Sequence, residues 1–268
     1  MKPTYIILSA LLVGPLVASA GDEPTSQEIA ACTERNLSEP DTIRAVRIVA
    51  RDRSGSKKVT VAKFFGRRTE DGRRQQRLEF MEPAELRGTQ ILLLEGGDEN
   101  EIYLKSSEIN EVKRIHGLGR AAALFESDFT YEDFEHLQGF KSPGQSQRLE
   151  DTVIGDRSVY VIEKRPDKKA RSSYESIISF VDKQTCVPLR IDFYEPGDRL
   201  RKELTVDSSE ISKRGSVWIA HAALLRDVRD HTTTTILVAS SEQRALPAEL
   251  FSAVAFQHGD PPVAAPSR

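Results

Sequence analysis

The sequence predicts a mainly β domain, of the α+β kind, with one helix ahead of the strands and one helical insertion between two runs of strands. Apolar and polar residues alternate with a period of two in about ten segments. The segment 106–139 lacks that period and is rich in helix formers. Strand-rich chains form sandwiches or barrels, and a curved sheet wrapped round inserted helices suits this order of elements.

The first twenty residues are typical of a cleaved secretory signal. Lys2 precedes an apolar run, and small residues stand at Ala18 to Ala20, where signal peptidase cleaves. The run is shorter than the roughly 20 apolar residues that cross a bilayer. We therefore expect a signal peptide over 1–20, a single domain over 21–258 and a disordered tail over 259–268. No Cys follows the run directly, so we expect no lipid anchor.

The charge of the chain argues against nucleic acid as a partner. The formal net charge is −3, and loss of Lys2 with the signal makes it −4. A nucleic-acid-binding domain instead carries a basic patch. The mature chain is also rich in charged residues, so one face of most strands must be in water.

The next element is a short helix at "TSQEIAACTERNL". Thr25 or Ser26 ahead of Glu28 forms a capping pattern, and Cys32 lies on the helix. Cys186 is the other cysteine, and an even pair in an exported chain predicts a disulfide. Such a bridge would stabilise the fold by roughly 5 kcal/mol in the chain-entropy model. It would pin the helix to the strand around Val187.

The insertion contains the acidic and aromatic segment "SDFTYEDFEHL", 127–137. One interpretation is an acid–base pair formed by Asp128 and Asp133 with Glu132. The other is a helix that starts near Thr130, capped by Ser127 or Asp128, whose first-turn acids complement the helix dipole by about 0.3–1 kcal/mol each. We favour the helix, because these acids fit its cap and first turn, and it then places Tyr131 and Phe134 on one face.

The sequence offers no enzyme signature. It has no G-x-S-x-G elbow, no H-E-x-x-H spacing and no phosphate loop, and its five histidines are scattered. We expect no catalytic residues, no cofactor and no metal. A secreted hydrolase is the weakest of the functional hypotheses.

Several segments resemble a known family. "VKRIHGLGRAAALFESDFTYEDF" is similar to the "SDF-Y-D" block of the outer-membrane lipoprotein-sorting proteins, in the LolA/LolB-like superfamily of periplasmic carriers. "EPAELRGTQILLLEG", "IYLKSSEINEVKRI" and "VDKQTCVPLRIDFYEPGDRLRKEL" are similar to other strands of that family. The resemblance covers roughly residues 32–250. Lys105 and Glu126 stand where the family often has Pro and Gly.

The resemblance implies a half-open, strongly curved antiparallel β-barrel, with a helical lid over an apolar cavity. It implies a monomeric periplasmic carrier that binds the acyl chains of a lipid or lipoprotein. Such a carrier would shuttle its cargo between an inner-membrane RND or MMPL-like transporter and the outer membrane. The alternative is a non-catalytic envelope adaptor that uses the same fold, with a filled core, to bind a protein.

Strand parity and the insertion together predict the cavity lining. We expect one set of apolar side chains to face it: Val46, Ile48, Leu78, Phe80, Ile91, Leu93, Phe129, Tyr131, Phe134, Ile178, Phe180, Ile191, Phe193 and Trp218. We further expect Arg114 to pair with Asp128 or Asp133 and so latch the lid.

Overall fold

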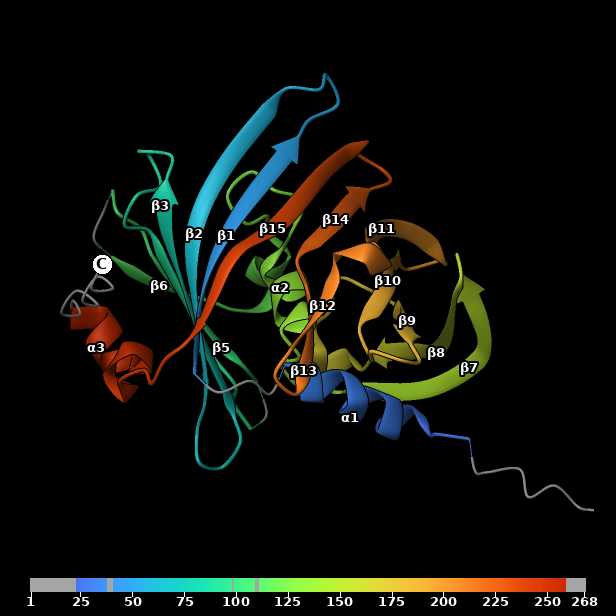
Figure 1. Cartoon of the computed structure of the whole chain (residues 1–268). Helices are drawn as coiled ribbons and strands as arrows, with labels where there is room; N and C mark the ends of the chain where they lie inside the picture. The colour runs from blue at the N-terminus through green and yellow to red at the C-terminus, as the bar shows by residue number, and fades with distance from the viewer. Residues whose placement is uncertain (1–22, 38–40, 98, 109–110, 259–268) are drawn as a thin grey trace, which may run out of the picture.

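A computed structural model of the chain describes residues 23–37, 41–97, 99–108 and 111–258 (Figure 1). The predicted signal peptide and the predicted tail lie outside the described residues. None of the helices that the structure describes is long and apolar enough to span a membrane.

Strands dominate the described part of the chain. The main sheet contains β1 (Thr42–Arg51), β2 (Lys57–Arg68), β3 (Arg74–Glu82), β4 (Gln90–Leu94), β5 (Glu101–Lys105), β6 (Val112–Ile115), β7 (Gly144–Ile154), β8 (Arg157–Pro166), β9 (Ser176–Asp182), β10 (Pro188–Glu195), β11 (Arg199–Thr205), β14 (Ala222–Asp227) and β15 (Thr232–Gln243). A separate pair consists of β12 (Ile211–Arg214) and β13 (Val217–Ala220). The helices are α1 (Ser26–Asn36), α2 (Tyr131–Leu137) and α3 (Ala253–His258), with short 3-10 turns η1 (Gly117–Ala121), η2 (Lys168–Ala170), η3 (Ser208–Glu210) and η4 (Ala248–Phe251).

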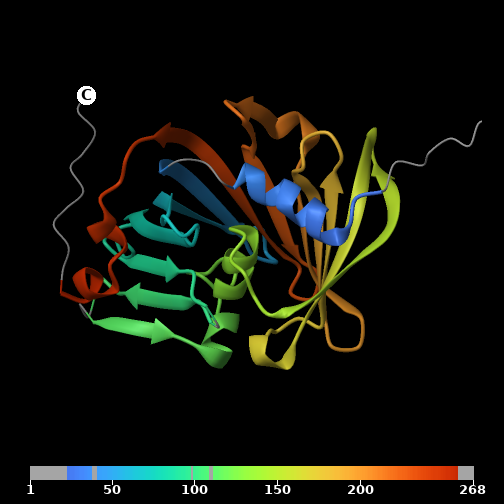
Figure 2. The same ribbon diagram turned by 90° about the horizontal axis from the view of Figure 1, so that it is seen from below.

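The main sheet is antiparallel throughout and does not close. Its described strands run in the order β6-β5-β4-β3-β2-β1-β15-β14-β11-β10-β9-β8-β7. The first and last of the described strands, β1 and β15, pair in the middle, so the edges of this sheet are β6 and β7. The register shifts at Ala45/Val46, Val61/Ala62 and Phe193/Tyr194, and such bulges increase local twist. The result is the strongly curved sheet of Figure 2.

This strand order explains where the insertion goes. Strands β6 and β7 are consecutive along the chain but lie at opposite edges of the sheet. The segment 116–143 that joins them therefore has to cross from one edge to the other. It does so on the concave side and carries α2 into the middle of the fold (Figure 1). The predicted helical insertion is confirmed, although it also contains a strand, β6, that the pattern did not reveal.

Helix α1 covers another part of the concave side. Thr25 and Glu28 form the predicted capping box. Ile29 packs against Ile162 of β8 and Val181 of β9. Val181 has the same parity as Ile177, which joins the main core, so both point to the same face.

The predicted disulfide joins α1 to the start of β10. Cys32 and Cys186 are bonded, with their Cα atoms 5.6 Å apart and a separation of 154 positions in the sequence. Cross-linking of this kind is typical of proteins from oxidising compartments.

The convex side of β2–β5 is covered by the C-terminal segment. Phe251 of η4 and Phe256 of α3 pack on outward residues of the sheet, Phe65, Leu92 and Tyr103. Arg77 is buried there. It donates to the carbonyl oxygen of Leu250 at 3.2 Å and lies 5.6 Å from the centre of the Phe256 ring. These strands are therefore buried on both faces.

Candidate functional site: an apolar cavity under helix α2

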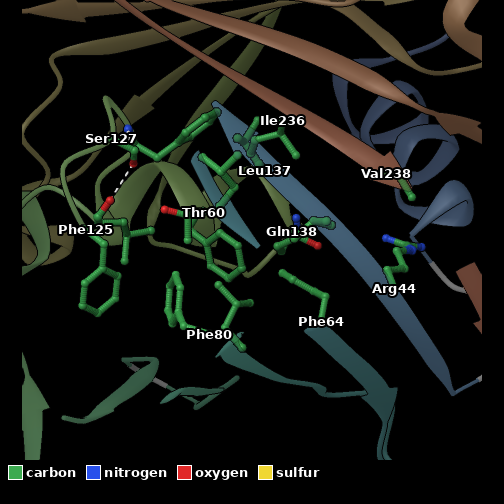
Figure 3. Close-up of a pocket in the computed structure, with 16 residues that line it drawn as sticks. Arg44, Thr60, Phe64, Phe80, Phe125, Ser127, Leu137, Gln138, Ile236 and Val238 are labelled. Carbon is green, nitrogen blue, oxygen red and sulfur yellow. Dashed lines mark hydrogen bonds between the residues drawn. The ribbon is translucent and has the colours of Figure 1, made fainter. Parts of the chain in front are cut away.

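An apolar cavity of about 110 Å³ lies between the concave face of the sheet and the insertion (Figure 3). Strands β1, β2, β3 and β15 form its floor, and residues 124–138 form its roof. Its lining is Arg44, Val46, Ile48, Thr60, Phe64, Leu78, Phe80, Leu124, Phe125, Ser127, Phe129, Phe134, Leu137, Gln138, Ile236 and Val238.

Strand register explains the floor. Val46 lies opposite Ala62 on β2 and Val238 on β15, and Phe64 lies opposite Leu78 on β3. Directly opposite residues of an antiparallel pair share a face, so these side chains all point inward. A cavity lined by aliphatic and aromatic side chains is suited to an apolar ligand.

Most of the side chains predicted to line the cavity lie on its side of the sheet. Six of them line it: Val46, Ile48, Leu78, Phe80, Phe129 and Phe134. Five more are buried in the hydrophobic core that surrounds it: Ile91, Leu93, Tyr131, Ile191 and Phe193.

Three predicted lining residues lie elsewhere, so their assignment is corrected. Ile178 and Phe180 have the opposite parity to Ile177 and face the other side of β9, where Arg190 stacks on Phe180 at 5.4 Å. Trp218 belongs to the separate hairpin β12–β13, and its backbone N–H donates to Asn36 at the end of α1. The assignment failed on β9 because apolar residues occur on both of its faces.

The roof contains residues that sequence reasoning missed as lining. Phe125 packs edge-on against Phe80, with ring centres 4.4 Å apart, and Phe134 lies 5.2 Å from Phe64. Phe64 and Phe65 are adjacent, so parity alone did not tell which one faces inward. The rings that precede α2 were the available signal for Phe125.

Helix α2 is capped and anchored by its acids. Its N-cap is Thr130, not Ser127 or Asp128 as predicted, and it forms a capping box with Asp133. Asp133 is fully buried and accepts hydrogen bonds from the Lys202 ammonium at 2.6 Å and the Tyr174 hydroxyl at 2.6 Å. Burial, and then the charge of Asp133, hold the pKa of Tyr174 well above its usual value, so this hydroxyl stays a donor.

The neighbouring acids are also used as anchors. Asp128 accepts hydrogen bonds from the hydroxyls of Thr232 and Thr234 on β15. Glu132 accepts from the backbone N–H of Ser173 at 2.9 Å. These contacts tie the insertion to the β9–β15 side of the sheet.

Glu135 holds α2 to the other part of the insertion. The Arg120 guanidinium of η1 lies 2.6 Å from its carboxylate, and the side chain of Asn100 donates to it at 2.9 Å. Burial raises the pKa of Glu135 more than Arg120 lowers it. The acids of "YEDFE" therefore serve structure, as the helix interpretation predicted.

The predicted latch is not formed in the described structure. Arg114 on β6 pairs with Glu101 on β5 at 3.2 Å, and both side chains are substantially exposed. Asp133 instead forms an ion pair with Lys202, a residue that was not among the predicted latch residues. Lys202 also donates to the carbonyl oxygen of Asp128, so one buried cation contacts both aspartates of the insertion.

One serine and one histidine do come together outside the cavity. The Ser212 hydroxyl lies 2.6 Å from Nε2 of His221, and Ser212 is exposed. No carboxylate among the described residues is hydrogen-bonded to His221. The described residues also contain no group of three or more His, Cys, Asp or Glu placed to hold a metal ion.

The open curved sheet with a helix across its concave face defines a fold class. The fold is shared with a putative outer membrane lipoprotein-sorting protein domain from Vibrio parahaemolyticus, at TM-score 0.76 and 21% identity over 86% of this chain and 97% of that one. A LolA superfamily protein from Nitrosomonas europaea has TM-score 0.66 and 17% identity over 87% and 99%. The chain thus has the fold of the LolA superfamily, as the resemblance predicted.

The family follows from sequence. A family model described as "Uncharacterized protein" matches residues 72–258, which is well over half of the chain, and the chain belongs to that family. A DUF1329 family protein from Desulfovibrio piger shares the fold at TM-score 0.78 and 21% identity, over 85% of this chain and 96% of that one. A search of curated protein sequences gives no significant match.

Proposed function

We propose that this protein is a non-catalytic carrier that binds an acyl chain in the cavity under α2. The observation that carries the proposal is the apolar lining, in which phenylalanine rings of the insertion face the aliphatic floor of β1, β2, β3 and β15. Each methylene group removed from water contributes about 0.8 kcal/mol, so a cavity of this composition favours acyl chains over polar ligands.

Uptake of a whole chain requires the roof to move. A cavity of about 110 Å³ is smaller than the cavity of about 150 Å³ that accepts a benzene ring. The roof consists of α2 and the loop before it, and that loop holds Phe125 and Glu126 in the left-handed backbone region, at φ 43° and 59°. We infer that this segment is the lid, which shifts with Phe125 and Phe129 as the ligand enters.

The setting of the carrier follows from the predicted signal and the disulfide, which both favour the periplasm. A carrier of lipids or lipoproteins between an inner-membrane RND or MMPL-like transporter and the outer membrane remains the role implied by the resemblance. The likeness to a putative lipoprotein-sorting domain supports the lipoprotein part of this proposal, and the transporter stays a prediction.

The test is to fill the cavity and leave the fold intact. Ile236→Trp on β15 places an indole in the cavity, whereas Leu237→Trp places it on the opposite, exposed face of the same strand. The protein is purified from a periplasm without detergent and weighed by native mass spectrometry, and its bound material is extracted with organic solvent.

We expect a discrete lipid mass on the wild type and on Leu237→Trp, and its loss from Ile236→Trp. A wild-type protein that carries no lipid and takes up no fluorescent fatty acid would contradict the carrier proposal. That result would favour the alternative, an envelope adaptor with a filled core.

A further inference from the structure

The inner face of the sheet is amphipathic along its strands. Beyond the apolar cavity, β1, β2 and β3 all become polar toward the same end. There Thr42 lies opposite Gly66, Gly66 lies opposite Gln76, and Arg68 lies opposite Arg74. These residues have the parity of Phe64 and Leu78, so they face the same concave side. They line a second pocket of about 30 Å³.

Arg74 is the unusual member of this pocket. It is only 3% exposed, and its Nε and Nη2 atoms have no hydrogen-bond partner among the described residues. It stands directly across from Arg68, and like charges at such positions repel. Burial, and then Arg68, lower the pKa of Arg74 below its usual value, although Glu34 and Glu95 raise it. A guanidinium remains charged at neutral pH even so.

The nearby carboxylate of Glu95 is already engaged with the backbone. One of its oxygens accepts the backbone N–H of Arg74 at 2.7 Å, and the other accepts the backbone N–H of Lys141 at 3.4 Å. The Arg74 side chain lies beside Gly139, whose missing Cβ lets the guanidinium approach the backbone closely. A Cβ at this position would lie 3.2 Å from the Cζ and Nη2 atoms of Arg74.

The arginine pocket is continuous with the apolar cavity. Arg44, Phe64 and Gln138 line both. Figure 3 shows Arg44 at the opposite end of the cavity from Phe125. A single ligand that reaches from one pocket to the other would therefore be apolar at one end and anionic at the other.

We propose that Arg44, Arg68 and Arg74 bind the phosphate of an anionic amphiphile whose acyl chain occupies the apolar cavity. Arginine suits phosphate because its N–H groups donate in a planar fork that matches the oxygens. The proposal rests on the carrier function and adds the class of headgroup. An anion here would accept from the unbonded nitrogens of Arg74 and offset the repulsion between Arg68 and Arg74.

The test compares two amphiphiles that differ only by the phosphate, 1-myristoyl lysophosphatidic acid and 1-myristoylglycerol. Binding is measured by isothermal titration calorimetry below the critical micelle concentrations. The key variant is Arg74→Met, which keeps an unbranched, flexible side chain and removes the charge. Arg68→Gln is the second variant, in case Arg74→Met does not fold. Arg47→Gln, on the exposed face of β1, removes one positive charge outside the pocket.

We expect the wild type and Arg47→Gln to bind the phosphate amphiphile at least about tenfold more tightly than the neutral one, as befits charged hydrogen bonds. In Arg74→Met and Arg68→Gln that preference should fall to about twofold or less. Without ligand, Arg74→Met should melt close to the wild type, because losing the repulsion from Arg68 and the two unbonded nitrogens offsets losing the attraction to Glu34 and Glu95.

Each contrary result has its own meaning. Equal affinity of the wild type for both amphiphiles, or a preference that survives in both arginine variants, overturns the headgroup site and leaves the carrier proposal standing. Failure to bind either amphiphile contradicts the carrier proposal itself. Inorganic phosphate could also bind as tightly as the phosphate amphiphile, and equally well to Ile236→Trp. That result would identify a site for free anions and contradict the proposal that the ligand is an amphiphile.

Discussion

The two faces of strands β2–β5 are both buried, but by different means. On the convex face, η4 and α3 lay Phe251 and Phe256 on Phe65 and Leu92, and two arginines stack on their rings. On the concave face, α2 is held by buried acids, and its rings stand over a cavity. Apolar packing dominates the first cover, whereas the second adds buried charged anchors to its ring contacts.

This difference has a functional consequence. A cover held by close apolar packing leaves no room, because protein interiors pack as densely as organic crystals. A cover held at a few polar anchors does not need its rings to fill the space beneath it. The anchors of α2, Asp133 to Lys202 and Glu135 to Arg120, lie at its sides, so the space between the rings and the sheet can stay available for a ligand.

The largest effect is expected from breaking the main anchor of α2. Asp133→Asn leaves the ammonium of Lys202 buried without its counter-charge, which should destabilise the fold by about 4 kcal/mol. Chemical unfolding in urea measures this. The double variant Asp133→Asn with Lys202→Met removes the lone charge and should recover a large part of the loss. A single variant as stable as the wild type would show that the anchor is dispensable.

The next effect separates the two faces directly. Phe256→Ala on the convex face should cost about 3 kcal/mol of stability and leave ligand uptake unchanged. Phe80→Ala removes a ring of similar burial that borders the cavity, so it should cost somewhat less and enlarge the cavity. Uptake of a fluorescent fatty acid should rise only in Phe80→Ala. The same change in uptake for both variants would contradict the assignment of the cavity to the concave face.

A smaller effect should appear on acidification. Burial, and then the charge of Lys164, lower the pKa of His136 on α2 to about 4. In the unfolded chain this histidine has its ordinary pKa of about 6.5. Between pH 4 and pH 6.5 the unfolded chain therefore binds more protons than the folded protein. The stability that this histidine contributes is full above pH 6.5 and falls as the pH drops toward 4. Because the side chain keeps some contact with solvent, we expect a loss of up to about 2 kcal/mol.

Thermal melting across this pH range measures the loss. His136→Gln should flatten the profile, whereas His258→Gln, at the exposed end of α3, should not. A profile that stays unchanged in His136→Gln would assign the acid sensitivity to other groups.

The smallest effect concerns the cap of α2. Thr130→Ala removes the hydroxyl that accepts the backbone N–H of Asp133 and should cost about 1 kcal/mol. Thr130→Ser keeps that acceptor and should restore most of the stability. Equal losses in the two variants would mean that the methyl group of Thr130, rather than its cap, matters.

Local patterns predicted the elements that depend on local physics. Thr25 with Glu28 marked the start of α1, and alternating residues marked β1 and β3, because capping and strand parity act between near neighbours. The pattern failed where it was ambiguous. Segment β6 is only four residues long, and β9 carries apolar residues on both faces, so Ile178 and Phe180 were assigned to the wrong side.

The sequence by itself determined the strand-rich class, the capped helix in "SDFTYEDFEHL" and the cysteine pair. Only the tertiary structure decided the partners of buried charge. Lys202 meets Asp133 across 69 residues, and Arg74 meets Arg68 through a register that no local pattern records. The reason is physical. Caps and parity depend on a few adjacent residues, whereas the cavity, its anchors and its arginine end arise from the curvature that brings distant strands under one helix.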